Sequence, residues 1–160
     1  MASFNVRWFP DGKPGKQAPS HGGTDAEWLG CVLADLDVDA IAVQEFKTLP
    51  RAQEVLARVL AELDRLSGGS WRAGFDDCPT PATQHVGILY DSRRVRAGAP
   101  RVVAELNPHG EKCKDTLRPG YELALTWPGG QALRFVSVHF KSEADARSLG
   151  LRDRSFEVLG

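Results

Sequence analysis

Two polar side chains stand in or at the end of apolar segments, where a protein scaffold can present them to a ligand. Asn5 lies within the apolar stretch 2–9, and Glu45 follows Gln44 at the end of the apolar stretch 39–45. Because a buried amide without a partner costs roughly 1–3 kcal/mol, Asn5 should be hydrogen-bonded within the fold. Glu45 is either an exposed acid at a strand end or a ligand for a hard cation such as Mg²⁺, which prefers oxygen atoms.

Three basic side chains later in the chain are further candidates. His139 lies near the end of the apolar stretch 136–140, and a single histidine in such a place is usually a satisfied core residue. His85 has the same character in a weaker context. Arg118 opens a strand pattern, where its guanidinium could bind a phosphate through two parallel hydrogen bonds or form a surface ion pair.

These side-chain types match the needs of phosphoester hydrolysis. A phosphodiester anion repels nucleophiles and has a poor leaving group. An enzyme that cleaves it therefore needs a carboxylate-held cation, donors for the phosphate oxygens and a base for water. The sequence has no Walker loop, because residues 12–16 lack the GxxxxGK[ST] spacing, and it has no HExxH, GxSxG or paired CxxC motif.

The first half of the chain alternates strand and helix patterns. The apolar stretch 2–9 indicates a buried strand stopped by Pro10, and 11–23 has the composition of an exposed loop. Thr24 and Glu27 predict a capping box for a helix with apolar residues at helical spacing: Leu29, Val32, Leu33 and Leu36. After a strand over 39–45, a second helix is opened by Pro50, closed by Gly68–Gly69, and apolar at Leu56, Val59, Leu60 and Leu63.

The second half has mostly strand patterns. Short strands are predicted over 71–75, 86–90 and 101–106, a polar loop over 107–116, and a hairpin over 121–127 and 133–140. Ser142 and Asp145 suggest a cap for a last helix over 143–159. The β-α-β-α start followed by antiparallel strands predicts an α/β layered fold.

The bulk properties indicate one soluble globular domain over 1–160. The chain has 42% hydrophobic and 26% charged residues and a net charge of −1. The chain has no overall positive charge, which argues against a protein that coats nucleic acid. A local phosphate pocket does not need such a charge. No apolar run reaches the length of a transmembrane helix.

The cysteines and the start of the chain bear on its compartment. Cys31, Cys78 and Cys113 are scattered, which fits a reducing compartment with at most one disulfide bridge. Cys31 falls in the apolar pattern of the first helix and is expected in the core. A strand pattern follows Met1 directly, so the chain as written is cytoplasmic; a misplaced start could hide an export signal.

In this order, the segments resemble the endonuclease/exonuclease/phosphatase superfamily, which includes the pancreatic-type deoxyribonucleases. The resemblance covers nearly the whole chain. It rests on FNVRW with Asn5, IAVQEF with Glu45, the VGILYD strand, Arg118 at a strand opening, and VSVHFKS with His139. It implies a four-layer α/β sandwich of two mainly antiparallel sheets flanked by helices, of which this chain would form the N-terminal part.

The resemblance also implies roles for these residues. Glu45 would bind a divalent metal, Mg²⁺ or else Mn²⁺ or Ca²⁺, with Asn5 as a further metal or phosphate contact. Arg118 and His139 would contact the scissile phosphate, and His139 could transfer a proton. Gln84 falls where some nucleases carry a glutamate that partners a histidine, so that carboxylate is absent here.

Two family motifs have no counterpart: the Asp-x-Asn after the histidine strand and its helix, and the terminal Asp-His pair that activates water. Loss of that base should lower the rate of hydrolysis by a factor of roughly 10²–10⁴. We therefore expect a phosphodiesterase or nuclease, acting on substrates that include DNA or RNA, whose residues 1–160 are inactive alone. A partial sandwich should also leave apolar surface exposed and self-associate.

Other functions stay open at this point. The same scaffold serves phosphomonoesterases, inositol-phosphate hydrolases and sphingomyelin hydrolases. A non-catalytic binding module or pseudoenzyme would keep the scaffold without the base. An unrelated α/β protein would leave Asn5, Glu45 and His139 scattered in space.

Overall fold

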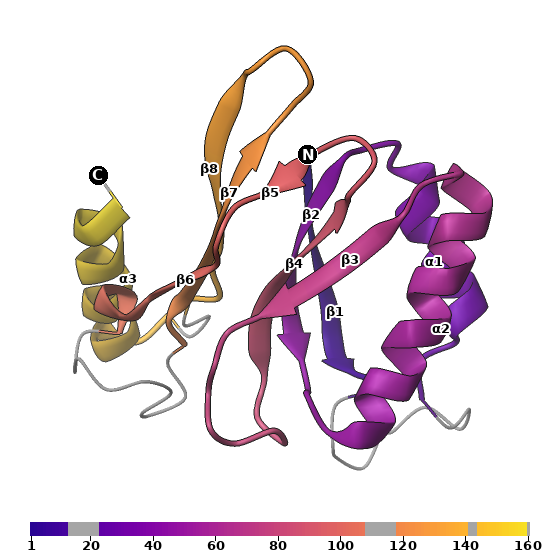
Figure 1. Ribbon diagram of the computed structural model, residues 1–160. Helices are drawn as coiled ribbons and strands as arrows, with labels where there is room; N and C mark the ends of the chain where they lie inside the picture. Colours follow the sequence, from indigo (N-terminus) through magenta and orange to yellow (C-terminus); the bar gives the residue numbers. More distant parts are fainter. Residues whose placement is uncertain (13–22, 108–117, 141–143, 160) are drawn as a thin grey trace.

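The computed structural model describes residues 1–12, 23–107, 118–140 and 144–159. Within these ranges the chain forms two β-sheets and three α-helices, which confirms the predicted α/β class (Figure 1). Most of the predicted loops 11–23 and 107–116 lies outside the described residues, as do Cys113 and Ser142. None of the described helices is both long and apolar enough to cross a membrane.

The first sheet, sheet A, has the strand order β1-β2-β4-β3. Its strands are β1 (Ala2–Phe9), β2 (Ala40–Phe46), β3 (Trp71–Phe75) and β4 (His85–Asp91). β1 and β2 are parallel, whereas β2 with β4 and β3 with β4 are antiparallel. β2 and β4 lie in the middle of the sheet and are buried along almost their whole length, because both faces of sheet A are covered.

Helices α1 (Ala26–Asp35) and α2 (Pro50–Ser67) cover one face of sheet A (Figure 1). Their apolar sides form one core cluster with β1, β2 and β3, and its innermost side chains include Leu33, Leu63, Ile41 and Phe9. α2 begins at Pro50 and ends at Gly68, which has a φ of 67° that glycine adopts without strain. Both ends of α2 were predicted from these residues.

Two details predicted for α1 are wrong. The N-terminal cap is Asp25, not Thr24: the Asp25 carboxylate accepts the backbone N–H groups of Glu27 and Trp28, both at 3.0 Å. Cys31 is exposed instead of buried. The buried face of α1 is centred on Leu29, Gly30 and Leu33, and at about 100° per residue Cys31 is turned away from it.

The second sheet, sheet B, lies against the other face of sheet A (Figure 1). It contains β5 (Arg96–Ala97), β6 (Arg101–Val103), β7 (Gly120–Thr126) and β8 (Ala132–Ser137), in the order β5-β7-β6 with β8 also paired to β7. The side chains between the sheets form a second core cluster that includes Val86, Ile88, Leu123 and Leu125. The predicted strand 101–106 ends early, because Ala104–Leu106 forms a 3-10 turn, η1.

The last helix, α3 (Ala146–Leu159), completes the layers on the outer side of sheet B, where it packs against η1. The Asp145 carboxylate caps it by accepting the backbone N–H and the hydroxyl of Ser148, at 3.1 and 2.7 Å. Figure 1 shows the order α1 and α2, sheet A, sheet B, α3. The described chain therefore has the partial four-layer sandwich that we predicted.

Candidate active site

Glu45 is the centre of a polar cluster at one end of the two sheets. Its Oε1 accepts a hydrogen bond from the Asn5 amide at 3.0 Å, and its Oε2 accepts one from the Gln84 amide at 2.8 Å. The Glu45 side chain is 15% exposed, so it is held by its neighbours but still accessible. Residues 40 positions apart along the chain thus meet where β1, β2 and β4 come together.

Asn5 was predicted to be a buried strand amide and is in fact exposed. Both ends of its amide nevertheless have partners: the nitrogen donates to Glu45, and the oxygen accepts the backbone N–H of Arg7 at 2.8 Å. Asn5 is thus in direct contact with the Glu45 carboxylate.

Arg118 and His139 join the cluster from the sheet B side of the chain. Arg118 Nε donates to the Gln84 backbone carbonyl, and Nη2 lies 3.3 Å from the Gln84 side-chain oxygen. His139 Nε2 lies 3.8 Å from Glu45 Oε1. His139 follows the end of β8 at Ser137, slightly beyond the regular strand. The structure therefore brings together Asn5, Glu45, Arg118 and His139, which the sequence placed in four separate segments.

The charges of this cluster are partly desolvated. Burial lowers the pKa of Arg118, and the negative charges of Asp76 and Glu45 oppose that effect. Burial also lowers the pKa of His139, the Glu45 carboxylate opposes the shift, and the Arg118 charge adds to it. A lowered pKa favours the neutral imidazole of His139, and a neutral imidazole can accept a proton or a hydrogen bond.

The backbone is strained around the cluster. Four described residues other than glycine have positive φ, and three of them adjoin the site: Arg7 at 47°, Trp8 at 62° and Glu45 at 64°. In the pairing of β2 with β4, Gln44 faces Val86 and Phe46 faces His85, so Glu45 is the extra residue of a β-bulge. This bulge separates Gln44, which is buried toward Ser137 of β8, from Glu45, which enters the site.

His85, the weaker histidine candidate, lies outside this cluster. Its ring is 1% exposed, with Nδ1 at 2.7 Å from the Asp76 carboxylate and Nε2 at 3.2 Å from the Thr48 hydroxyl. Asp76, Cys78 and His85 offer potential metal-ligand atoms within 4.8 Å of one another. Cys78 is disulfide-bonded, however, and Asp76 and His85 already have hydrogen-bond partners. This group is therefore a structural contact, and the bridge at Cys78 agrees with the limit of one disulfide.

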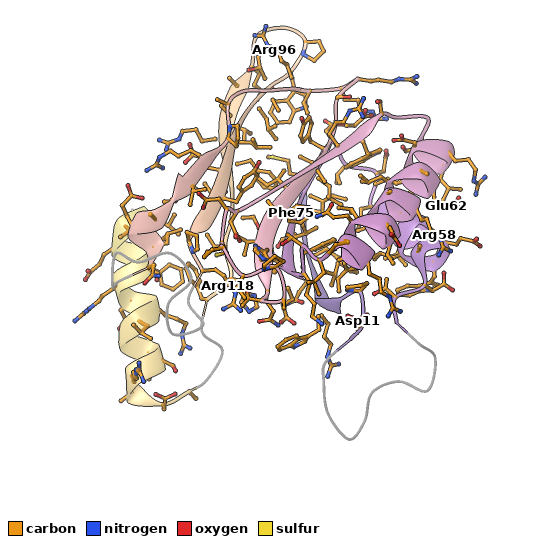
Figure 2. The ribbon with its side chains drawn as sticks, turned by 60° about the horizontal axis from the view of Figure 1, so that its bottom comes forward. Asp11, Arg58, Glu62, Phe75, Arg96 and Arg118 are labelled. Carbon is orange, nitrogen blue, oxygen red and sulfur yellow. The ribbon has the colours of Figure 1, made fainter. Side chains whose placement is uncertain are left out.

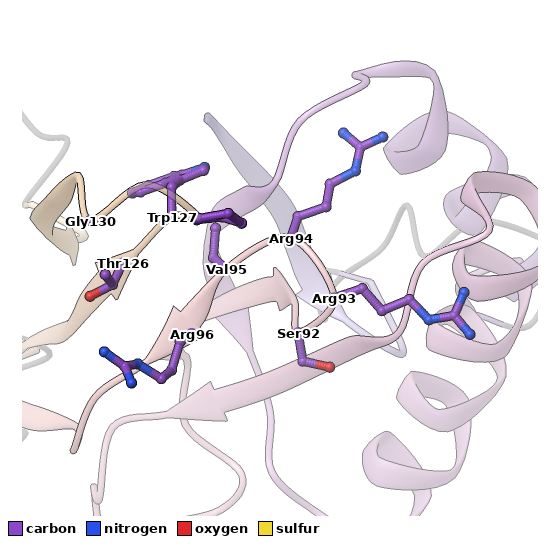
Figure 3. A pocket seen from close by; sticks show the side chains of 9 residues that line it. Ser92, Arg93, Arg94, Val95, Arg96, Thr126, Trp127 and Gly130 are labelled. Atoms are coloured by element: carbon purple, nitrogen blue, oxygen red, sulfur yellow. The ribbon is translucent and has the colours of Figure 1, made fainter.

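A pocket of about 370 Å³ lies elsewhere, between the turn after β4 and the hairpin of β7 and β8 (Figure 3). Arg93, Arg94 and Arg96 line it, but Figure 3 shows their side chains pointing in different directions. Arg94 is paired with Asp39 at 3.0 Å. Figure 2 shows Arg96 at the top of the view, well away from Arg118. The pocket is therefore distinct from the cluster and does not gather its cations on one anion.

Comparison with known proteins identifies the fold. No family model matches the sequence, and no curated protein matches it either. The endonuclease/exonuclease/phosphatase from Bacteroides vulgatus matches 98% of this chain and 56% of its own length, with a TM-score of 0.68 and 13% identity.

The chain has the endonuclease/exonuclease/phosphatase fold.

Two further solved structures support this assignment. Bacteroides thetaiotaomicron mannosyl-6-phosphatase matches 98% of this chain with a TM-score of 0.62 at 16% identity, and the chain covers 55% of it. D. rerio TDP2 in complex with a single-strand DNA product matches 84% with a TM-score of 0.60 at 17% identity, and the chain covers 45% of it. The chain thus spans about half the length of these endonuclease/exonuclease/phosphatase-fold structures.

The contacts of Gln84 and Asp76 were not predicted from the sequence. Gln84 was noted only as the replacement of a carboxylate, yet it touches both Glu45 and Arg118. Its polar side chain directly before an apolar strand was the available signal. Asp76 lies in a stretch of mixed polar residues, and nothing in its neighbours marks it as a residue whose side chain is 0% exposed.

Proposed function

We propose that this chain carries the metal-binding and phosphate-binding part of a divalent-metal-dependent phosphoester hydrolase, with a phosphodiester as the substrate class. The observation that carries the proposal is the convergence of one carboxylate, one guanidinium and one imidazole around Gln84 and Asn5. Phosphoester cleavage requires three groups: a cation held by a carboxylate, a hydrogen-bond donor to the phosphate oxygens, and a proton acceptor.

Glu45 fits a hard divalent cation such as Mg²⁺, with Mn²⁺ or Ca²⁺ as substitutes. A carboxylate has about four acceptor positions, and the two amide donors leave the others for a cation. Mg²⁺ sites commonly use one or two carboxylates and complete the shell with water. When bound, the cation would supply positive charge to the phosphate oxygens.

Arg118 and His139 would contact the phosphate. The Nε and Nη2 atoms of Arg118 are turned toward Gln84, which fixes the plane of the guanidinium beside Glu45. A guanidinium held in one plane is suited to bind a phosphate. The neutral imidazole of His139 would hydrogen-bond a phosphate oxygen or accept a proton beside Glu45.

The substrate class rests on the fold and on local charge. The solved structures with this fold include one that holds a single-strand DNA product and one mannosyl-6-phosphatase. Both phosphodiesters, including DNA and RNA, and phosphomonoesters are thus compatible with the scaffold. We favour a diester, because the segments with Asn5, Glu45 and His139 resemble those of the pancreatic-type deoxyribonucleases.

A binding module without turnover is the second candidate. In the described part of the chain, the one histidine that is hydrogen-bonded to a carboxylate is His85, and that pair is buried. It cannot reach a water molecule at Glu45. A module would bind phosphate and metal and release both unchanged.

Calorimetric titration with Mn²⁺ tests the proposal directly. The 160-residue chain should bind Mn²⁺, and Glu45→Gln should weaken that binding by about tenfold or more, since the variant loses the charged ligand. Glu62→Gln on α2 is the matched control, because Glu62 forms its ion pair with Arg65 on the same helix. Absence of Mn²⁺ binding to the native chain would refute the proposal.

Hydrolysis of bis-p-nitrophenyl phosphate and nicking of plasmid DNA separate enzyme from module. With Mg²⁺ the chain alone should show little or no turnover. A longer protein that supplies a base should be active, and addition of EDTA should abolish that activity. Activity that survives both Glu45→Ala and His139→Ala would remove these residues from the site. Binding of Mn²⁺ without turnover in the longer protein would favour the module.

A further inference from the structure

Asp76 is a buried carboxylate with an unusually complete set of partners. Its side chain is 0% exposed. Oδ1 accepts His85 Nδ1 at 2.7 Å and the Cys78 backbone N–H at 3.0 Å, and Oδ2 accepts the Val86 backbone N–H at 2.7 Å. A carboxylate removed from water is tolerated only with such donors, so these contacts fix the position of the first residues of β4.

His85 extends this contact to two other segments. Its Nε2 lies 3.2 Å from the Thr48 hydroxyl, just after β2, and 3.2 Å from the Thr80 carbonyl in the loop before β4. The Thr48 backbone N–H also donates to the Pro81 carbonyl at 2.9 Å, which joins the same two segments. The imidazole thus joins the end of β2, the 76–83 loop and the start of β4.

The candidate site is built on these same segments. Gln84 immediately precedes His85, and Gln84 is the residue that contacts both Glu45 and Arg118. His85 also pairs with Phe46 across the bulge that contains Glu45. The Asp76 charge acts on the Arg118 guanidinium and opposes the lowering of its pKa by burial. Glu45, Gln84 and Arg118 therefore depend on a junction that none of them forms itself.

We propose that Asp76, through His85, is a positioning residue that holds Gln84 and Arg118 in the arrangement that receives a phosphoester. The purpose of that arrangement rests on the proposed function, whereas the positioning itself is a property of the fold. Asp76 touches no substrate; it acts by fixing the β4 start from which Gln84 reaches Glu45 and Arg118.

Asp76→Asn tests this proposal, because it keeps the shape of the side chain and removes the charge and one acceptor atom. The readout is the Arg118 Nε–H signal in ¹H–¹⁵N NMR spectra of the 160-residue chain, with its hydrogen exchange rate. We expect the signal to shift and its exchange to speed up by about tenfold, since the bond to the Gln84 carbonyl is weakened.

Asp91→Asn is the matched control. Asp91 is also a buried carboxylate of β4, and it accepts the backbone N–H groups of Ser70 and Arg93 at 2.8 and 3.0 Å, at the other end of the strand. A general loss of stability would affect both variants. A positioning role predicts that the Arg118 signal changes in Asp76→Asn and stays in place in Asp91→Asn.

Thr48→Val is a milder second variant for the case that Asp76→Asn does not fold. It removes the hydroxyl beside His85 and should move the Gln84 side-chain amide signals. An unchanged Arg118 signal in folded Asp76→Asn, or unchanged Gln84 signals in Thr48→Val, would overturn the proposal. None of these readouts needs metal or turnover. If the native chain binds neither Mn²⁺ nor phosphate while Asp76→Asn moves Arg118, the proposed function fails and the positioning role stands.

Discussion

At the residue scale, the candidate site depends on three side chains whose charges influence one another. Glu45 is hydrogen-bonded by two neutral amides, so its negative charge stays available to His139 and Arg118. His139 lies between an anion that raises its pKa and a cation that lowers it, with burial as the largest influence. Its protonation state is therefore a sensitive report on the site.

The pKa of His139 gives the first prediction. A titration followed by the imidazole C–H signals in NMR should give a pKa below the ordinary value for histidine, because burial disfavours the charged ring. Glu45→Gln should lower it further, since the variant removes the charge that stabilises the protonated form. An increase in the His139 pKa in Glu45→Gln would contradict the observed geometry.

At the scale of secondary-structure elements, close approach of strands fixes the site end of sheet A. Gly87 of β4 pairs with Phe75 of β3, and a Cβ atom on Gly87 would lie 2.4 Å from the Gly74 carbonyl oxygen. Backbone at that distance cannot yield as a flexible side chain can. Phe75 in turn packs on Phe46, the residue next to Glu45, at 4.9 Å between ring centroids.

Gly87→Ala should therefore lower the free energy of unfolding by about 1–3 kcal/mol, the usual range for overpacking. Gly150→Ala on α3 is the control: a Cβ there meets nothing within 4 Å, and alanine in a helix gains about 0.5–1 kcal/mol over glycine. Urea denaturation measures both. Equal stability of Gly87→Ala and the native chain would mean that β3 and β4 can separate without cost.

The hairpin of β7 and β8 is tied to sheet A at the end away from the site. The Trp127 indole N–H donates to the Asp39 carboxylate at 2.8 Å, and this bond, followed by the contact with Arg94, lowers the pKa of Asp39. A carboxylate with a lowered folded pKa contributes stability above its unfolded pKa. That contribution is lost as the pH falls through the folded value.

Trp127→Phe should remove this contribution while keeping an aromatic side chain. We expect a loss of about 1 kcal/mol at neutral pH, because Asp39 is partly exposed to water, and a difference that shrinks below about pH 4. Denaturation curves of both proteins across pH 3–7 measure it. A difference that grows in acid would contradict the sign of the Asp39 shift.

At the scale of the whole molecule, the outer helices bury their apolar side chains to different extents. α1 and α2 bury one face of sheet A, whereas α3 turns its two serines inward, at 5% and 3% exposure for Ser148 and Ser155. Four large apolar side chains of α3 remain exposed: Leu149, Phe156, Val158 and Leu159. Apolar groups gathered on one helix favour contact with another surface.

We therefore expect the 160-residue chain to self-associate at high concentration. Sedimentation velocity should show species larger than a monomer that decrease in Leu149→Ser/Phe156→Ser. Trp28→Ser is the control, because Trp28 is 63% exposed but lies on α1, far from α3 in the layer order. A native chain that stays monomeric throughout would refute the expectation.

The sequence by itself determined most of the secondary-structure elements and the side-chain types of the candidate site. Hydrophobic periodicity, Pro50 and Gly68 define α2, and Asn5, Glu45, Arg118 and His139 were recognisable as polar residues in or near strand ends. Such signals are local, because they depend on propensity and spacing over a few residues. The N-terminal cap of α1 and the end of β6 were predicted wrongly, since neighbouring residues compete for the same position.

The tertiary structure decided how these residues meet. Positive φ at Glu45 and the bulge around it arise from the pairing of β2 with β4, and no local pattern in QEF requires them. The roles of Gln84 and Asp76 likewise depend on contacts with residues from 9 to 39 positions away. Contacts across such separations exist only when the sheets have assembled. The sequence therefore predicted which side-chain types are present in the candidate site, but not which of them are in contact.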